Sequence, residues 1–266
     1  MASVAVPTRG GARQLRLVVH QIYFEQLSFW RNPIGAGFTV VFSVLFLVLL
    51  GATGGQSTVS YLGGIKAIQY YVAGFAAYGV MSACFNMLAI NIVIRREMGL
   101  LKRMRLSPLP RWILMTGIFA NALIVSAVQV VLLLVVGRYG YGAQMPSNWL
   151  ALVVALFTGV VCFTALGVAA STFIPNQDSA GPVISIVFFV LLFLSGLWYP
   201  LKPGSTLARV SDWFPVRHLI TATFAPFDLR PGVSAWSWND IAVMAIWVVV
   251  GAFVALRRFR WAPMKG

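Results

Sequence analysis

Six long apolar stretches constrain this sequence more than any other feature. They are residues 33–52, 67–94, 112–137, 149–173, 181–200 and 238–256. Apart from Asp240 near the edge of the last stretch, none of them contains Asp, Glu, Lys or Arg. A helix needs ~20 apolar residues to cross ~30 Å of hydrocarbon, whereas a barrel strand needs about 10 alternating ones. The lengths therefore predict an all-α polytopic membrane protein with six transmembrane helices, and we expect residues 1–266 to form a single transmembrane domain.

The positive charge of the chain is concentrated in three of the polar segments. Of the 20 Lys and Arg residues, 14 lie before the first apolar stretch, in the connection 95–111 or in the tail after residue 256. Loops rich in Lys and Arg remain on the cytoplasmic side of a membrane. We therefore expect a multi-pass protein of the plasma (inner) membrane with both termini in the cytoplasm. The patchy charge favours membrane lipids over nucleic acid as its partner.

An amphipathic helix is expected at residues 12–31, before the first span. Its polar side would carry Arg13, Arg16, His20, Gln21, Ser28 and Arg31, and its apolar side Leu15, Val18, Val19, Ile22, Tyr23, Phe29 and Trp30. Such a helix lies along a membrane surface. The alternative is an ordinary cytoplasmic helix packed against protein.

The connection between the second and third spans, IRREMGLLKRMRLSPLPRW (94–112), has more charge than a simple loop requires. Met98, Leu101 and Met104 or Arg105 recur at about one helical turn, which predicts a short helix, and Pro108 and Pro110 would end it. The alternative is a positively charged anchor that contacts only lipid headgroups.

Three segments resemble the permease subunits of type-2 ABC exporters, especially their drug-resistance (daunorubicin-type) branch. The first is REMGLLKRMRLSPLPRW, which is similar to the cytoplasmic loop of that family. The second is FLSGLWYPLKP (193–203), similar to a Ser-Gly-aromatic-Pro segment at the outer end of the fifth span. The third is WFPVRHLITATF (213–224), similar to a Pro-x-x-His stretch in the last outer loop. Their order and spacing match the family along nearly the whole chain.

The resemblance implies that the basic loop is a cytoplasmic coupling helix that docks into a groove of a separate ABC ATPase subunit, present in two copies. A second permease copy or a paralogue would complete the path. The implied ATPase contact consists of Arg95, Arg96, Glu97, Gly99, Leu100, Lys102, Arg103, Arg105, Pro108 and Pro110. Residues 200–239 would form short re-entrant outer helices, with an outer gate at Ser195, Gly196, Tyr199, Pro200 and Pro215.

Polar and aromatic side chains within the spans are candidates for a substrate path. They are Asn86, Asn91, Asn121, Gln129, Phe42, Phe75 and Phe189. The alternative for each polar residue is a hydrogen bond between helices, which contributes about 0.6–2 kcal/mol. Ion-coupled transporters place charged residues inside their spans, and the absence of such residues here favours an external energy source.

The sequence predicts a transport subunit and not an enzyme. The phosphate-binding pattern Gly-x4-Gly-Lys-Ser/Thr is absent, so we expect no cofactor on this chain, with ATP and Mg bound by the partner ATPase. His20 and His218 stand far apart without a Cys or carboxylate cluster, and no metal site is expected.

The function predicted is export of hydrophobic drug-like or lipid-like molecules. The alternatives are a glycan (polysaccharide) exporter permease of the same superfamily, or a non-transporting membrane accessory protein.

Overall fold

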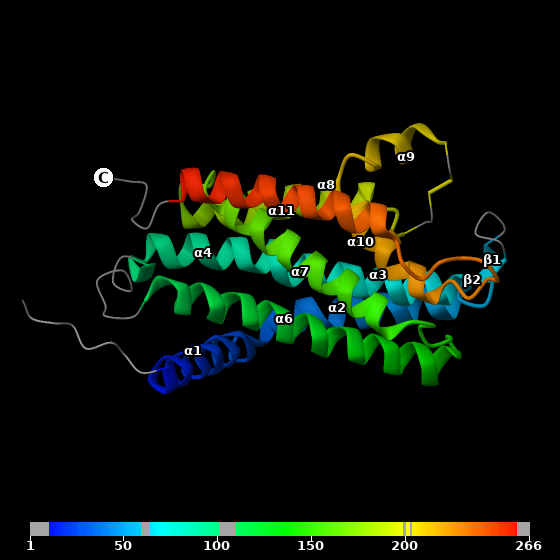
Figure 1. The fold of residues 1–266 in the computed structure, drawn as a ribbon, viewed down its shortest axis with the longest axis horizontal. Helices are drawn as coiled ribbons and strands as arrows, with labels where there is room; N and C mark the ends of the chain where they lie inside the picture. Colours follow the sequence, from blue (N-terminus) through cyan, green and yellow to red (C-terminus); the bar gives the residue numbers. More distant parts are fainter. Residues whose placement is uncertain (1–10, 60–63, 102–109, 199–200, 203, 260–266) are drawn as a thin grey trace, which may run out of the picture.

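The computed structural model describes residues 11–59, 64–101, 110–198, 201–202 and 204–259. Its long helices run side by side in an elongated bundle (Figure 1). Six of the segments described are long and apolar enough to cross a membrane: Pro33–Gly54, Ala67–Glu97, Trp112–Gly140, Trp149–Ser171, Gln177–Leu194 and Trp238–Arg258. The predicted all-α polytopic fold class is confirmed.

The elements described follow one another along the chain with short connections. They are α1 (Gly11–Trp30), α2 (Pro33–Gly54), β1 (Thr58–Val59), β2 (Ile65–Lys66), α3 (Ala67–Met81), the π-helical turn η2 (Ser82–Met87), α4 (Leu88–Glu97), α6 (Arg111–Val135), the π-helical turn η3 (Val136–Gly140), α7 (Trp149–Ser171), α8 (Gln177–Leu194), α9 (Thr206–Ser211), α10 (Pro215–Phe224), the 3₁₀ turn η4 (Ala225–Phe227) and α11 (Trp238–Arg258). The two strands pair antiparallel, with Thr58 opposite Lys66.

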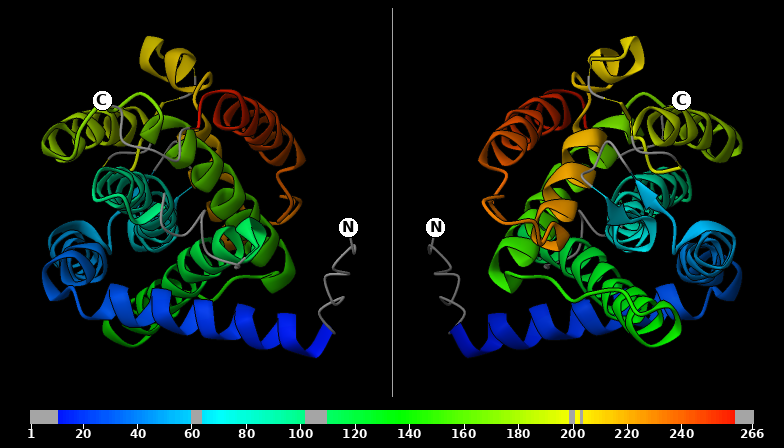
Figure 2. Two further views of the ribbon diagram at one scale, coloured as in Figure 1. Left: turned by 90° about the vertical axis from the view of Figure 1, so that its left-hand side faces the viewer. Right: turned by 90° about the vertical axis from the view of Figure 1, so that its right-hand side faces the viewer.

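Helix α1 lies crosswise to the long helices and packs on α6 at one end of the bundle (Figure 2). Its exposed side carries apolar residues, with Leu15 66% and Tyr23 60% exposed, and also the exposed polar residues Arg16 and His20. The chain then turns sharply into α2. The Asn32 side chain accepts a hydrogen bond from the Gly35 amide at 3.1 Å, and Pro33 occupies the first helical position, where its missing N–H costs nothing.

The second span is the central helix of the bundle. Elements α3, η2 and α4 form one continuous segment of 31 residues, Ala67–Glu97, which at 1.5 Å per residue extends about 46 Å. It therefore exceeds the ~30 Å hydrocarbon layer. Its neighbours approach it through small residues: a Cβ added at Gly167 of α7 would lie 2.6 Å from the Cys84 carbonyl oxygen. Such close backbone approach is how helices pack in membranes.

Helix α8 differs from the span expected at residues 181–200. It begins four residues earlier, because the Asn176 side chain caps it by accepting a hydrogen bond from the Ser179 amide at 2.9 Å. Pro182 therefore falls inside the helix, at its sixth position, where its missing N–H leaves the Asp178 carbonyl without a helical hydrogen bond. The helix ends at Leu194, and Gly196 follows with a φ of +78°, a left-handed conformation that glycine adopts without strain.

The expected short outer helices are α9 and α10, at the end of the bundle away from α1 (Figure 1). Helix α10 packs against α3, α7 and α11, and Leu219 and Ile220 on it are buried. The described part of 200–239 therefore folds back onto the ends of the long helices.

Candidate functional site

The candidate coupling residues lie at the α1 end of the bundle, where α4 ends. Arg95, Arg96 and Glu97 form the last turn of α4. Gly99 follows with a φ of +69°, and its amide donates to the Arg96 carbonyl at 3.0 Å, which ends the helix. Leu100 is partly exposed. The rest of the predicted coupling helix, with Lys102, Arg103, Arg105 and Pro108, lies outside the described residues, and Pro110 directly precedes α6.

The Arg96 guanidinium is buried and binds a neighbouring turn of the chain. Only 1% of Arg96 is exposed. It donates to the Ser171 carbonyl at 3.0 Å and to the Ile174 carbonyl, which belong to the end of α7 and the turn before α8. A cation at a helix C-terminus stabilises carbonyls that have no partner within the helix. Arg96 was expected to contact a partner protein, but its side chain instead ties two parts of this chain together.

The neighbouring Arg95 binds α1 through a two-pronged ion pair. Its two terminal nitrogens lie 2.8 and 2.7 Å from the two carboxylate oxygens of Glu25, and Gln21 donates to the same carboxylate at 3.0 Å. Only 6% of Glu25 is exposed, so its charge depends on these partners. The sequence interpretation missed Glu25, although it is the single acidic residue before Glu97, which was the available signal.

The polar residues predicted to line a path do not gather at one place. Gln129 is fully buried and donates to the Thr39 carbonyl at 3.1 Å and to the Ser43 hydroxyl at 2.6 Å, joining α6 to α2. The alternative reading, a hydrogen bond between helices, is the one that fits Gln129. Asn86 lies in the π-helical turn, and in the described part of the chain its side-chain oxygen has no hydrogen-bond partner.

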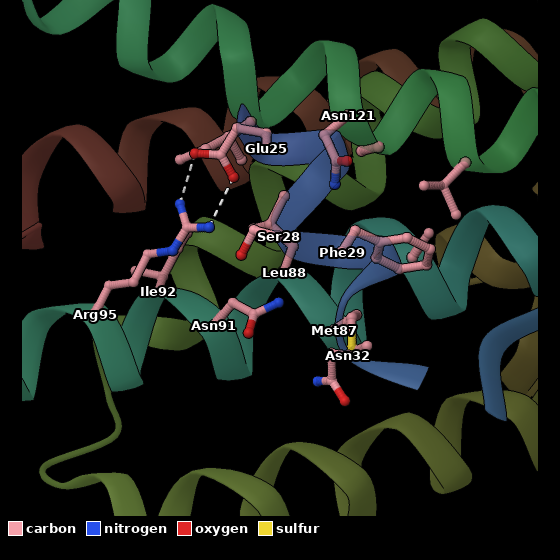
Figure 3. Close-up of a pocket in the computed structure, with 14 residues that line it drawn as sticks. Glu25, Ser28, Phe29, Asn32, Met87, Leu88, Asn91, Ile92, Arg95 and Asn121 are labelled. Atoms are coloured by element: carbon pink, nitrogen blue, oxygen red, sulfur yellow. Dashed lines mark hydrogen bonds and ion pairs between the residues drawn. The ribbon is translucent and has the colours of Figure 1, made fainter. Parts of the chain in front are cut away.

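Two of the predicted path residues do meet. Asn91 of α4 and Asn121 of α6 line one pocket of about 190 Å³ beneath α1 (Figure 3). Gln26 of α1 donates to the Asn121 side-chain oxygen at 2.9 Å. The Glu25–Arg95 pair closes one side of this pocket.

The predicted aromatic residues divide between the interior and the surface. Phe42 and Phe75 belong to a cluster of rings with centroids 4.4–6.4 Å apart, made of Phe42, Phe46, Phe75, Tyr78, Phe188 and Trp198. Phe75 is fully buried in that cluster, whereas 53% of Phe189 is exposed on α8.

The predicted outer gate is partly described. The Tyr70 hydroxyl donates to the Gly196 carbonyl at 2.7 Å, and the buried Ser195 hydroxyl accepts from the Leu197 amide at 3.0 Å. Pro215 begins α10 and is buried. Tyr199 and Pro200 lie outside the described residues.

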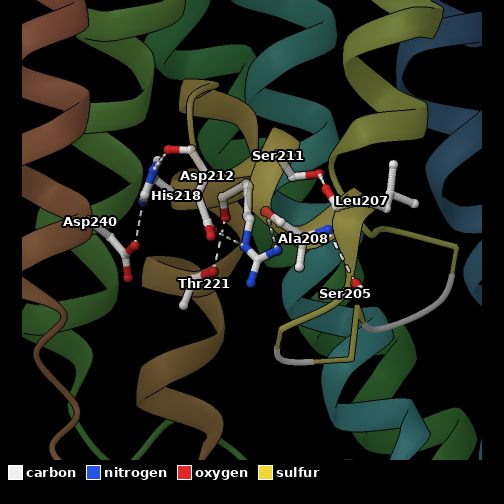
Figure 4. A network of polar contacts seen from close by, with 9 residues as sticks. Ser205, Leu207, Ala208, Ser211, Asp212, His218, Thr221 and Asp240 are labelled. Atoms are coloured by element: carbon white, nitrogen blue, oxygen red, sulfur yellow. Dashed lines mark hydrogen bonds and ion pairs between the residues drawn. The ribbon is translucent and has the colours of Figure 1, made fainter.

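A histidine at the end of the bundle away from α1 joins α10 to the start of α11 (Figure 4). His218 Nδ1 lies 2.6 Å from the Asp240 carboxylate, and Nε2 lies 2.9 Å from the Asp212 carbonyl. Burial alone would lower the pKa of His218, but the hydrogen bonds and the charges of Asp240 and Asp212 outweigh it, so the pKa is raised. Because both ring nitrogens face acceptors, the protonated imidazolium satisfies both.

We predict that the Glu25–Arg95 pair holds α1 to the bundle. Glu25→Gln and Arg95→Met should each lower stability by about 1.5–3 kcal/mol, because each leaves one buried partner unsatisfied, measured as thermal unfolding in detergent. The double variant Glu25→Gln/Arg95→Met should lose less than the sum of the two. Strict additivity in this double-mutant cycle would show that the pair makes no specific contribution.

The His218 contact predicts a pH dependence of stability. A pKa that is higher in the folded state than the unperturbed ~6.5 gives stability that is complete below ~6.5 and is lost as the pH rises through the folded pKa. The melting temperature should therefore fall over that window, and His218→Gln should flatten the profile. Asp240→Asn removes the partner of the same contact and should flatten the melting-temperature profile over the same pH window. A wild-type slope retained in both variants would contradict the assignment.

Comparison with known proteins agrees with this architecture. The family model of the ABC-2 family transporter proteins matches residues 56–257. The chain is 23% identical over 193 residues to the putative transport permease YvfS of Bacillus subtilis (strain 168), which covers 71% of this chain and 76% of that protein. It is 24% identical over 176 residues to the probable multidrug ABC transporter permease YbhR of Escherichia coli (strain K12), which covers 65% of this chain and 47% of that protein. The chain thus spans about half of the second relative.

The family match extends over most of the chain, and the described residues contain six helices of membrane-spanning length. The protein therefore belongs to the ABC-2 family of transporters and is a multi-pass membrane permease.

Proposed function

We propose that this chain is the permease subunit of an ATP-driven exporter and that it receives mechanical force at residues 95–111 from a separate ATPase. The observation that carries the proposal is the double attachment of the end of α4. Arg95 fixes it to α1 and Arg96 fixes it to the α7–α8 turn. A loop anchored in this way can transmit a push to several helices together.

The electrostatics of this end support the same proposal. The connection 95–111 contains six Lys and Arg residues and one acidic residue, Glu97. Within this chain, Arg95 already binds Glu25 and Arg96 already binds the Ser171 carbonyl. The remaining basic residues of the connection are the ones proposed to contact an acidic or polar groove of the ATPase, since charge complementarity governs the specificity and rate of such docking.

The proposed assembly contains two permease chains and two ATPase subunits, in the inner membrane with both termini of each permease in the cytoplasm. ATP and Mg would be bound by the ATPase, since the chain lacks the phosphate-binding pattern. Drug-like or lipid-like molecules are the proposed cargo. The YbhR relative, named as a multidrug permease, supports this cargo class.

A second candidate cargo is a glycan. It is favoured by an open groove at the outer end that is lined by Arg209, Trp213, Phe214 and Trp247. Trp213 is 79% exposed, and exposed aromatic faces beside polar groups suit sugar rings. Export assays with an amphiphilic dye and with a lipid-linked glycan, each in the same proteoliposomes, separate the two cargoes.

The force-transmission proposal predicts that reversing one charge of the loop uncouples the motor. After co-purification has identified the ATPase, the Arg103→Glu permease should support at least about tenfold less stimulated ATP hydrolysis and export than the wild type, because a like-charge contact costs several kcal/mol. Reconstituted proteoliposomes provide the measurement.

The matched control is Arg257→Glu, which makes the same charge change at the end of α11, where Arg257 lies over the Phe253 ring. This variant should keep most of the wild-type activity. Undiminished ATP hydrolysis and export in Arg103→Glu would refute the proposed contact, and equal losses in both variants would show that only total charge matters.

A further inference from the structure

Polar side chains line much of the pocket beneath α1, but its two charged side chains are already paired with each other. Its charged residues, Glu25 and Arg95, are already paired to each other through both carboxylate oxygens. A charged ligand would have to separate this pair, and breaking a largely buried ion pair costs several kcal/mol. The net charge of the lining is therefore zero, and an uncharged ligand fits it best.

Several hydrogen-bonding groups of the lining remain unused among the described residues. Asn91 and the Ser28 hydroxyl make no side-chain hydrogen bond there, and the amide nitrogens of Asn32 and Asn121 have none either, since only their oxygens are engaged. These groups belong to α1, α4, α6 and the cap of α2, and they line one pocket (Figure 3). Hydroxyl and amide groups converging in this way match the hydroxyl and carbonyl oxygens of a small neutral head group.

The pocket is large enough for such a head group. Its volume is about 190 Å³, well above the ~10–15 Å³ that a single water molecule needs, so a glycerol-sized or sugar-sized group fits in it. The remaining lining is apolar, with Phe29, Met87, Leu88 and Ile92.

Large apolar side chains lie beside the rim of the pocket, together with the exposed Arg31. Ser28 and Asn32 are the lining residues that are exposed on the stretch joining α1 to α2. Between and beside them, Trp30 is 46% exposed and Ile34 is 85% exposed. Tryptophan at such a position is typical of the membrane–water interface. A ligand entering here would leave its apolar part against these residues.

We propose that this pocket binds the uncharged, hydrogen-bonding head group of a membrane amphiphile, whose acyl chains lie against Trp30 at the end of α1 and Ile34 at the start of α2. In the orientation given under the proposed function, this amphiphile would belong to the inner leaflet, and that placement rests on the proposed function. The binding itself does not, and it requires neither the ATPase nor transport.

Protection of an engineered cysteine in the purified permease tests this proposal. Both native cysteines, Cys84 and Cys162, are free and fully buried, so maleimide labelling of Ser28→Cys reports on the pocket rim. In phosphatidylcholine nanodiscs, adding dioleoylglycerol at about 5 mol% should slow labelling several-fold by occupying the pocket. The matched control is Val19→Cys, which lies 2.5 turns away on the opposite side of α1 and is 58% exposed; its labelling rate should not change.

Two comparisons decide the chemistry. Asn91→Leu in the Ser28→Cys background should abolish the protection while Asn91→Gln, which keeps the amide, should retain part of it; the melting temperature of each variant verifies that it folds. Protection by dioleoylphosphatidylglycerol equal to that by dioleoylglycerol would overturn the neutral head group. Equal protection by free glycerol would overturn the amphiphile, and the absence of protection by dioleoylglycerol would overturn the site, with the proposed ATPase coupling unaffected in each case.

Discussion

One buried guanidinium fixes the geometry of the end of the molecule on which the proposed function depends. Arg96 is 1% exposed, and its hydrogen bonds to the Ser171 and Ile174 carbonyls join the last turn of the second span to the turn between α7 and α8. A buried cation is tolerated only when its donors are satisfied, and these two carbonyls, with the Glu97 carboxylate 3.2 Å from Nε, satisfy those of Arg96. The basic loop begins immediately after this fixed point.

Three helices meet at that point because of the two adjacent arginines. Arg96 faces the interior of the bundle, and Arg95 faces α1, where Glu25 receives it with both oxygens. Helix α1 lies crosswise to the long helices (Figure 2), so in the proposed function a displacement of the loop would be passed both to the bundle and to α1. Small residues such as Gly167 let α7 pack directly against the backbone of the second span. Separating these two helices would therefore lose close-packed contacts. In the proposed function, force applied to the loop would therefore act on several connected helices.

The sequence predicted those features of the fold that follow from solvent alone. Runs of apolar residues about as long as a bilayer crossing, or longer, predicted six candidate spans, and the amphipathic pattern before Pro33 agrees with the crosswise helix α1. Local capping moved a boundary: the start of α8 was expected at residue 181, but the Asn176 side chain starts it at Gln177. Capping depends on one side chain and is not visible in hydropathy.

The site was less predictable, because the roles of its polar residues depend on contacts far apart in the sequence. Arg95 and Arg96 look alike in the sequence, yet one binds α1 and the other binds the α7–α8 turn. Glu25 was missed because its partner lies 70 residues away. The predicted path residues also separated, since Gln129 joins two helices whereas Asn91 and Asn121 share a pocket. Hydropathy gives the depth of such residues but not the direction of their side chains.

The central claim is that Arg96 makes the end of α4 and the α7–α8 turn one mechanical unit. Hydrogen–deuterium exchange of the purified permease measures this most directly, in the wild type and in Arg96→Met. Loss of charged hydrogen bonds worth about 1.5–3 kcal/mol should speed amide exchange roughly tenfold or more in residues 97–101 and 172–176 together, while helix α10 at the opposite end stays unchanged. Faster exchange in only one of the two stretches, or in neither, in a variant that still folds would contradict the account.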